Sequence, residues 1–114
     1  MNEITIENKV YHDSEFRESG FNVTDFPWLD VAPGDYDVEL IARCFGNGKL
    51  RGSITIFCKR VDNGELFRCT LWRKSNDSQL FFGIRDIDNG STLRITCCKS
   101  KSSGRTYVAN LVAL

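Results

Sequence analysis

Segments in which apolar and polar residues alternate constrain the fold of this chain more than any other feature. An alternation with a period of two is typical of β-strands that bury one face and expose the other. It predicts five strands, at residues 35–45, 53–60, 65–73, 91–99 and 105–114. The sequence Asp62-Asn63-Gly64 has the turn chemistry of a tight hairpin, so the second and third strands are expected to pair as neighbours.

The apolar side of this alternation identifies the residues that are expected to form the core. On the first strand they are Tyr36, Val38, Leu40, Ala42 and Cys44. On the second and third strands they are Ile54, Ile56, Cys58, Phe67, Cys69 and Leu71. The other face of the third strand carries Arg68, Thr70 and Trp72. A cation and a large aromatic on the side away from the core require an explanation.

Between the third and fourth strands the alternation gives way to a helical pattern. Its apolar residues are Leu80, Phe81, Ile84 and Ile87, and its candidate N-cap residues are Asn76, Asp77 and Ser78. Three strands, a short helix and two more strands follow the order of the OB fold. We therefore expect an all-β chain that forms a five-stranded OB-fold-like Greek-key barrel with one short helix after the third strand. An open β-sandwich or a small SH3-like barrel is the alternative.

Residues 1–33 form a different segment, acidic and rich in aromatic residues, ahead of the barrel domain at residues 34–114. Pro27 and Pro33 disfavour a helix, so we expect an extended, turn-rich lead-in with one short strand at Ile4 to Val10. A disordered tail would not carry so many large apolar side chains. The lead-in is expected to pack on the domain through Phe21, Phe26, Trp28 and Leu29.

The five cysteines are expected to be reduced and mostly buried. Their number is odd, they form no C-x-x-C pair, and the neighbours Cys97 and Cys98 would point to opposite faces of a strand. No apolar stretch approaches the ~20 residues of a membrane-spanning helix. The N-terminus is acidic where a secretion signal is basic. We expect a cytoplasmic protein, in the host cytoplasm if the chain is viral, with no membrane partner.

The zero net charge conceals an uneven distribution. Residues 1–42 contain ten acidic and two basic residues, whereas residues 43–114 contain five acidic and thirteen basic ones. A division of this kind indicates a polyanionic partner for the basic part, or an acidic arm that shields it. Folding that interleaves the two parts would instead leave no basic surface.

The second and third strands of an OB fold, with the loops that join strands one and two and strands four and five, form its usual binding surface. The aromatic and basic candidates that fall there are Lys49, Arg51, Phe57, Lys59, Arg68, Trp72, Lys99, Lys101, Arg105 and Tyr107. Aromatic rings stack the bases of single-stranded nucleic acid without reading sequence, at ~1–3 kcal/mol per base. Basic side chains bind the phosphates and release counterions.

Three stretches, GDYDVELIARC, CKRVDNGELFRCTLW and LRITCCKSKSSGRTYVANLVAL, carry a resemblance over residues 34–114. They are similar to single-stranded DNA-binding OB-fold proteins, particularly the short ones encoded by phages. The resemblance implies binding of single-stranded DNA, favoured over RNA, with little sequence preference and in support of replication or recombination. The acidic lead-in departs from that family, which often has its acidic tail at the C-terminus. It predicts either a competitor for the binding face or an arm that docks a protein partner.

Each candidate also has a purely structural interpretation. Trp72 can be partly buried, Phe57 can lie beneath the lead-in, and Arg68 can pair with Glu65. The alternative function is a protein-interaction module, a small viral inhibitor or an assembly subunit, that presents residues 21–31 and binds no nucleic acid. A barrel that binds a carbohydrate through the same aromatics is a third interpretation. Self-association is left open by the sequence.

Catalysis has little support in the sequence. The single histidine, His12, has no serine or cysteine nucleophile motif nearby. Asp86 and Asp88 lack the further carboxylates of a metal loop, and residues 46–52 lack the spacing of a phosphate loop. We therefore expect no enzymatic activity, no cofactor and no metal.

Overall fold

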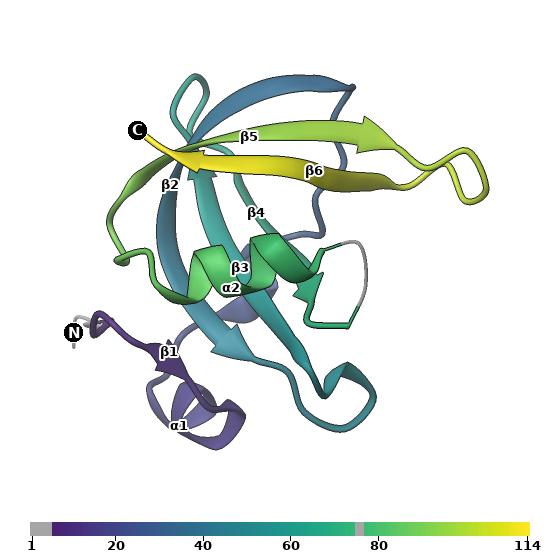
Figure 1. Ribbon diagram of the computed structural model, residues 1–114. Coiled ribbons are helices and arrows are strands. Elements are labelled where there is room, and N and C mark those ends of the chain that lie inside the picture. Colours follow the sequence, from purple (N-terminus) through teal and green to yellow (C-terminus); the bar gives the residue numbers. More distant parts are fainter. Residues whose placement is uncertain (1–5, 75–76) are drawn as a thin grey trace.

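A computed structural model describes residues 6–74 and 77–114 of the protein (Figure 1). Its strands are β1 (Val10–Tyr11), β2 (Gly34–Phe45), β3 (Ser53–Arg60), β4 (Leu66–Trp72), β5 (Thr92–Lys99) and β6 (Thr106–Ala113). Its helices are α1 (Asp13–Glu18) and α2 (Ser78–Arg85), with 3-10 turns η1 (Val23–Asp25) and η2 (Gly48–Leu50). The prediction of a mostly β structure is confirmed. Neither helix is long and apolar enough to cross a membrane, and the described residues contain no other helix that could.

The long strand β2 lies at the centre of one sheet with the order β4-β3-β2-β5-β6. These five strands pair with antiparallel neighbours, and the short β1 adds to β2 in parallel. β2 pairs with β5 through its first half, Gly34 to Glu39, and with β3 through Val38 to Phe45. Because one strand serves two partners in succession, the sheet curls, and the β5–β6 hairpin runs across the direction of β3 and β4 (Figure 1).

Within the described residues, the outer strands β4 and β6 do not pair with each other, so the sheet is not closed into a barrel. A segment of the lead-in, residues 27–31, lies along this opening, and we call it the strap. The Arg68 amide of β4 donates to the Pro27 carbonyl at 2.9 Å, and the Leu29 amide donates to the Arg68 carbonyl at 2.9 Å. At its far end, the Thr106 hydroxyl of β6 donates to the Val31 carbonyl at 3.0 Å. The strap therefore links two strands that do not meet.

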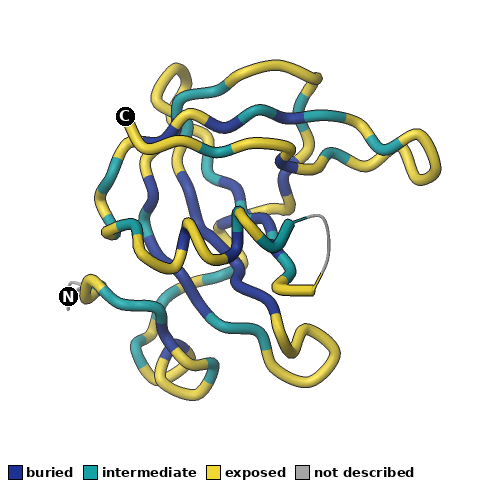
Figure 2. The backbone as a smooth tube through the Cα atoms, viewed as in Figure 1, coloured by how far each residue is buried: buried dark blue, intermediate teal, exposed yellow. Residues whose placement is uncertain are grey.

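The curled sheet encloses one large apolar core, seen as the buried central strands in Figure 2. β3 and β4 contribute the residues predicted for them, and α2 covers the core with Phe81 and Ile84. Asp77 precedes α2 at its N-cap position, and Asn76 lies outside the described residues. A second cluster lies on the opposite face of the sheet, where the lead-in packs; its buried members are Tyr11, Phe16, Phe26, Ala42, Cys44 and Phe57.

The expectation that Ala42 and Cys44 share the core face of β2 with Val38 and Leu40 is wrong. The pairing of β2 with β3 shifts register between Leu40 and Ala42, which leaves Ile41 as an extra residue. One inserted residue moves every later side chain to the other face of a strand. Ala42 and Cys44 therefore belong to the second cluster, beneath the lead-in.

The lead-in is more structured than the sequence suggests. It contains the helix α1 and the turn η1, so the expectation of an extended segment holds only in part. The strand expected at Ile4 to Val10 is limited to Val10–Tyr11 in the described residues, with residues 4 and 5 lying outside them. α1 directs Phe16 into the second cluster, and the expected anchors Phe26 and Leu29 are also buried.

All five cysteines are free; Cys98 is half-buried and the other four are buried. Burial raises the pKa of Cys44 and of Cys97 to about 11, and it raises the pKa values of Cys58 and Cys69 well above their usual range. A thiol with a raised pKa carries little of the reactive thiolate at neutral pH. These side chains therefore serve as small apolar core residues.

Ellman's reagent is expected to modify at most the Cys98 thiol promptly in the native protein near pH 8, because the four buried thiols are both protonated and inaccessible. Their reaction should accelerate as the pH rises toward their raised pKa values. In urea-denatured protein all five thiols should react at once, each releasing one thionitrobenzoate anion. Cys98→Ser should remove the prompt phase from the native protein. Rapid native modification of two or more thiols would contradict this burial.

Candidate nucleic-acid interface

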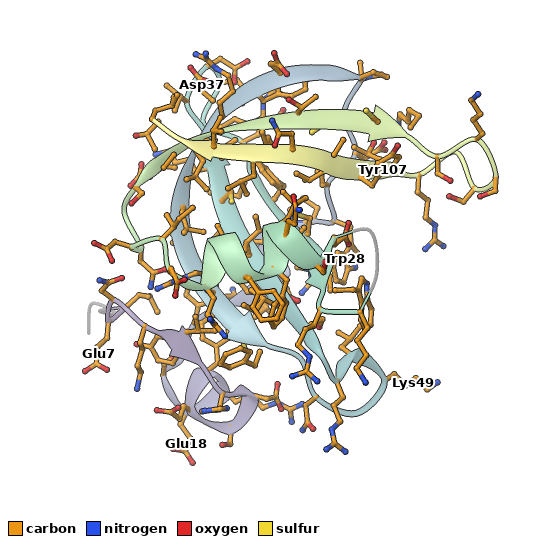
Figure 3. The ribbon with its side chains drawn as sticks, viewed as in Figure 1. Glu7, Glu18, Trp28, Asp37, Lys49 and Tyr107 are labelled. Carbon is orange, nitrogen blue, oxygen red and sulfur yellow. The ribbon has the colours of Figure 1, made fainter. Side chains whose placement is uncertain are left out.

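The loop between β2 and β3 (residues 46–52), the end of β4 and the turn of the β5–β6 hairpin (residues 100–105) surround the open edge of the sheet. Figure 3 labels Lys49, Trp28 and Tyr107 on this side of the molecule and Glu7 and Glu18 on the opposite side. The strap that carries Trp28 lies between β4 and β6. This region contains most of the residues that the sequence suggested for binding.

The cations of this region differ from the other surface cations in their partners. Elsewhere the surface basic residues other than Lys59 form ion pairs with carboxylates: Lys9 with Glu7 and Glu15, Arg17 with Asp13, Arg60 with Asp62, Arg85 with Asp86, and Arg94 with Asp37. Among the described residues, no carboxylate lies within ion-pair distance of Lys49, Arg51, Arg73, Lys74, Lys101 or Arg105, and all six are exposed. We call these six residues the basic rim. Its positive charge is available to an external anion.

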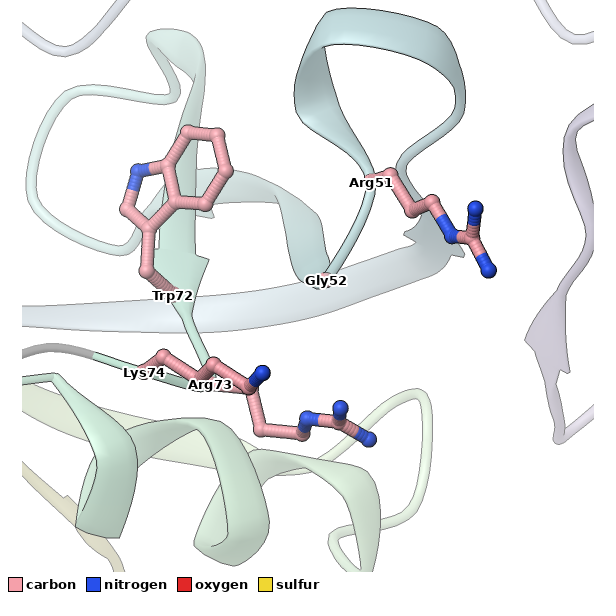
Figure 4. Close-up of a pocket in the computed structure, with 5 residues that line it drawn as sticks. All are labelled: Arg51, Gly52, Trp72, Arg73 and Lys74. Atoms are coloured by element: carbon pink, nitrogen blue, oxygen red, sulfur yellow. The ribbon is translucent and has the colours of Figure 1, made fainter.

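A hollow of about 460 Å³ separates the β2–β3 loop from the end of β4 (Figure 4). Its lining residues are Arg51, Gly52, Trp72, Arg73 and Lys74. The guanidinium groups of Arg51 and Arg73 extend toward the same side of the view in Figure 4, and the half-buried Trp72 ring lies across from them. A flat aromatic side chain thus adjoins two arginines that have no acidic partner in the described residues.

A second hollow, of about 820 Å³, runs between β4, the strap and the β5–β6 hairpin, and Trp72 lines this one too. Its other lining residues include Trp28, Arg68 and Arg105. A third, of about 640 Å³, lies between the lead-in and the β2–β3 loop and shares Trp28 and Arg68 with the second. Because neighbouring hollows share these residues, they adjoin one another, and we call the three together the groove.

Phe57 lies on the expected face of β3 and reaches the edge of the third hollow, but it is almost fully buried. Its ring is only 3% exposed and packs against Phe16, Phe21 and Phe26, with ring centroids 5.2, 5.2 and 5.3 Å away. The lead-in covers this end of the strand pair, so the assignment of Phe57 as a stacking residue is not supported. Phe57 belongs to the interface between the lead-in and the sheet.

Lys59 and Lys99 are also placed differently from the basic rim. Lys59 lies at the other end of β3 from the β2–β3 loop, next to Leu66 in the pairing with β4. Lys99 forms an exposed ion pair with Asp30 of the strap, with 3.0 Å between the Lys99 Nζ and an Asp30 carboxylate oxygen. An exposed pair of this kind is weak and exchanges readily with a competing anion. Tyr107, in contrast, is 47% exposed and follows the hairpin turn.

Arg68 has a partner that the sequence did not indicate. Its guanidinium carbon lies 4.4 Å from the centre of the Trp28 ring, whereas Glu65 lies near Arg60. Its Nε atom is buried and has no hydrogen-bond partner among the described residues. The aromatic contact is therefore the main interaction that holds the guanidinium in place.

The sequence interpretation missed Arg73 and Lys74 as binding candidates, although both follow Trp72 directly in the chain. It also treated Trp28 only as an anchor, whereas the structure exposes 53% of this residue. No group of three or more His, Cys, Asp or Glu side chains in the described part of the chain is arranged to hold a metal ion. Comparisons with protein-family models, with curated proteins and with solved structures found no match to this chain, so functional inference rests on the geometry of the groove and its basic rim.

Proposed function

We propose that this protein is an OB-fold-like domain that binds single-stranded DNA with little sequence preference, in support of replication or recombination. The observation that carries the proposal is the gathering of the basic rim and exposed aromatics around one groove. The strand order and the helix between β4 and β5 support this proposal, because an OB fold is a partly open five-stranded barrel. In that fold the loops corresponding to residues 46–52 and 100–105 contact the ligand.

The chemistry of the groove suits a single strand better than a duplex. Trp72 can stack on a base only where the face of that base is free, and in a duplex the base faces are already stacked on one another. The rim cations bind phosphates by charge, so they place no demand on base identity. Only contacts to the 2′-hydroxyl separate RNA from DNA. Competition between oligo-dT and oligo-U therefore tests the preference for DNA.

Fluorescence anisotropy of a labelled oligo-dT of about 25 nucleotides is the primary test. The wild type is expected to bind at low salt and to weaken steeply between about 50 and 200 mM salt, because each phosphate contact releases counterions. Trp72→Ala should weaken binding roughly 5- to 150-fold, as the loss of one stacked base predicts. Arg73→Ala should weaken binding and flatten the salt dependence.

Matched controls lie on α2, whose residues do not line the groove. Phe82 is an exposed aromatic and Arg85 an exposed, acid-paired arginine, so Phe82→Ala and Arg85→Ala should bind oligo-dT as the wild type does. Trp72→Phe separates stacking from folding, because it keeps an aromatic face at the same position. Absence of wild-type binding even at low salt would exclude the proposed function.

A specific observation favours the alternative, a protein-interaction module without nucleic-acid binding. Tyr107, Val112 and Leu114, at 47, 48 and 62% exposure, place apolar side chains on the outer strand β6 and just after it. An outer strand without charged residues is open to pairing with another chain. Size-exclusion chromatography distinguishes the two functions, because an apolar association persists in high salt whereas phosphate binding does not.

A further inference from the structure

We propose that Trp28 of the strap is a second base-stacking residue, so that the lead-in forms part of the nucleic-acid site. This inference rests on the proposed function and deepens it. It also replaces the expectation of a lead-in that competes for the binding face. Three features of the strap carry it: its fixed backbone, the contact of Trp28 with Arg68, and its position in the groove.

The backbone on both sides of Trp28 is fixed to the edge of β4. The Pro27 carbonyl accepts from the Arg68 amide and the Leu29 amide donates to the Arg68 carbonyl, both at 2.9 Å. Leu29 is buried in the main core, whereas Trp28 is 53% exposed. Adjacent side chains of an extended segment point in opposite directions. Burial of Leu29 therefore directs the Trp28 ring outward and holds it there.

The Trp28 ring is supported from one side. The Arg68 guanidinium lies 4.4 Å from the ring centre, which is within the range of a cation–π contact. This contact restrains the side-chain rotation that an exposed tryptophan would otherwise have. A ring that is already oriented loses less conformational entropy when a base stacks on it. More than half of the residue remains accessible for such a base.

The position of Trp28 matches the course of the groove. With Arg68 it lines both the hollow beside the β2–β3 loop and the hollow beside the β5–β6 hairpin. Trp72 likewise lines the hairpin hollow and the hollow of Arg51 and Arg73. A single-stranded nucleic acid that follows the groove thus meets the indole of Trp28 and then that of Trp72, or the reverse. Two rings from distant segments, with no demand on sequence, suit the successive bases of one single strand.

Four acidic residues of the lead-in form ion pairs with cations outside the basic rim, although two of them, Asp13 and Asp30, line the groove. Lys9 forms ion pairs with Glu7 and Glu15, and Arg17 forms one with Asp13. In the strap, Asp30 pairs with Lys99, which is outside the basic rim. These carboxylates therefore do not occupy the cations that a phosphate backbone would contact.

The decisive experiment uses tryptophan fluorescence, because Trp28 and Trp72 are the only two tryptophans in the chain. Trp72→Phe leaves Trp28 as the sole fluorophore. Titration of this variant with oligo-dT should quench its emission, and the quenching should be half-complete at the dissociation constant that anisotropy gives for the same variant. Trp28→Ala should weaken anisotropy-detected binding roughly 5- to 150-fold, Trp28→Leu should do the same while keeping an apolar side chain, and Trp28→Phe should retain most of the affinity.

The possible outcomes separate this inference from the proposed function. If the wild type binds oligo-dT but sole-Trp28 emission is unchanged, and folded Trp28→Leu binds like the wild type, then Trp28 is no stacking residue and the proposed function stands. If the wild type shows no anisotropy change at low salt, the proposed function fails and this inference fails with it. Phe82→Ala, an exposed aromatic substitution on α2, should change neither signal.

Discussion

Phe57→Ala is expected to lower the free energy of unfolding by about 3–5 kcal/mol, the usual cost of removing a buried phenylalanine ring. Three aromatic rings of the lead-in, those of Phe16, Phe21 and Phe26, pack around Phe57 with centroids 5.2–5.3 Å away. Their packing would collapse only partly into the space left by the ring. Urea denaturation followed by circular dichroism measures the change as a shift of the transition midpoint.

The same variant separates a structural role from a binding role. Phe82→Ala is the matched control, because Phe82 is 43% exposed and should lose far less stability. If Phe57→Ala unfolds at the wild-type urea concentration but no longer binds oligo-dT, then the ring contacts the ligand and the lead-in moves aside on binding. A large loss of stability, with binding retained by the molecules that remain folded, supports the packing described here.

Arg43→Met is expected to cost about 2–4 kcal/mol of stability, because it removes the hydrogen bonds that a buried guanidinium donates. Arg43 is 3% exposed, and its guanidinium donates to the carbonyls of Ile84 and Arg85 at 2.9 and 2.7 Å and to the Asn89 side chain at 2.8 Å. The last carbonyls of a helix have no partner within the helix. Arg43 thus caps the C-terminus of α2 from near the C-terminal end of β2.

Methionine at this position keeps much of the apolar volume and removes only the donors, so the loss should reflect the hydrogen bonds. Arg94→Met is the control, since Arg94 is exposed and pairs with Asp37 at the surface. It should leave the urea midpoint nearly unchanged. Hydrogen exchange adds a local readout, because the last turn of α2 should lose protection first in Arg43→Met. Equal midpoints for both variants would contradict the capping role.

The strand positions could be predicted from the sequence because burial of one face imposes a period of two. The predicted segment 53–60 coincides with β3, and segment 65–73 contains β4 with one extra residue at each end. Leu80, Phe81 and Ile84 of the predicted helical pattern lie in α2, whereas Ile87 lies just beyond its end. In each case the signal is local, since it depends on neighbours within a few residues.

The bulge in β2 shows where this signal fails. Ala42 and Cys44 continue the apolar alternation of Val38 and Leu40, yet they face the other cluster. Alternation reports that a side chain is buried but not which of two apolar layers buries it. The inserted Ile41 changes the face without interrupting the pattern.

The candidate site was predictable only where it depends on loop position. Arg51 and Arg105 follow from the strand order, because that order fixes which loops surround the binding surface. Phe57 was misassigned because its covering, the lead-in, lies far from it in sequence. Trp28 was missed as a groove residue for a similar reason, since its place is set by backbone pairing with Arg68. Contacts between residues so far apart in the sequence produce no pattern among neighbouring residues that could predict them.

The strap has a further consequence for how the chain is made. Val31 bonds to Thr106 across 75 residues, and the Asn89 amide donates to the Asn8 side chain across 81. The lead-in precedes its partners in the chain: its aromatic cluster packs on β2 and β3, whereas the strap needs β4 and, at its far end, β6. Phe16, Phe21 and Phe26 lack their partner Phe57 until β3 has been synthesised, and long-range contacts of this kind slow folding and favour aggregation. The lead-in therefore docks in two stages, its aromatic residues once β3 exists and the far end of its strap only after β6.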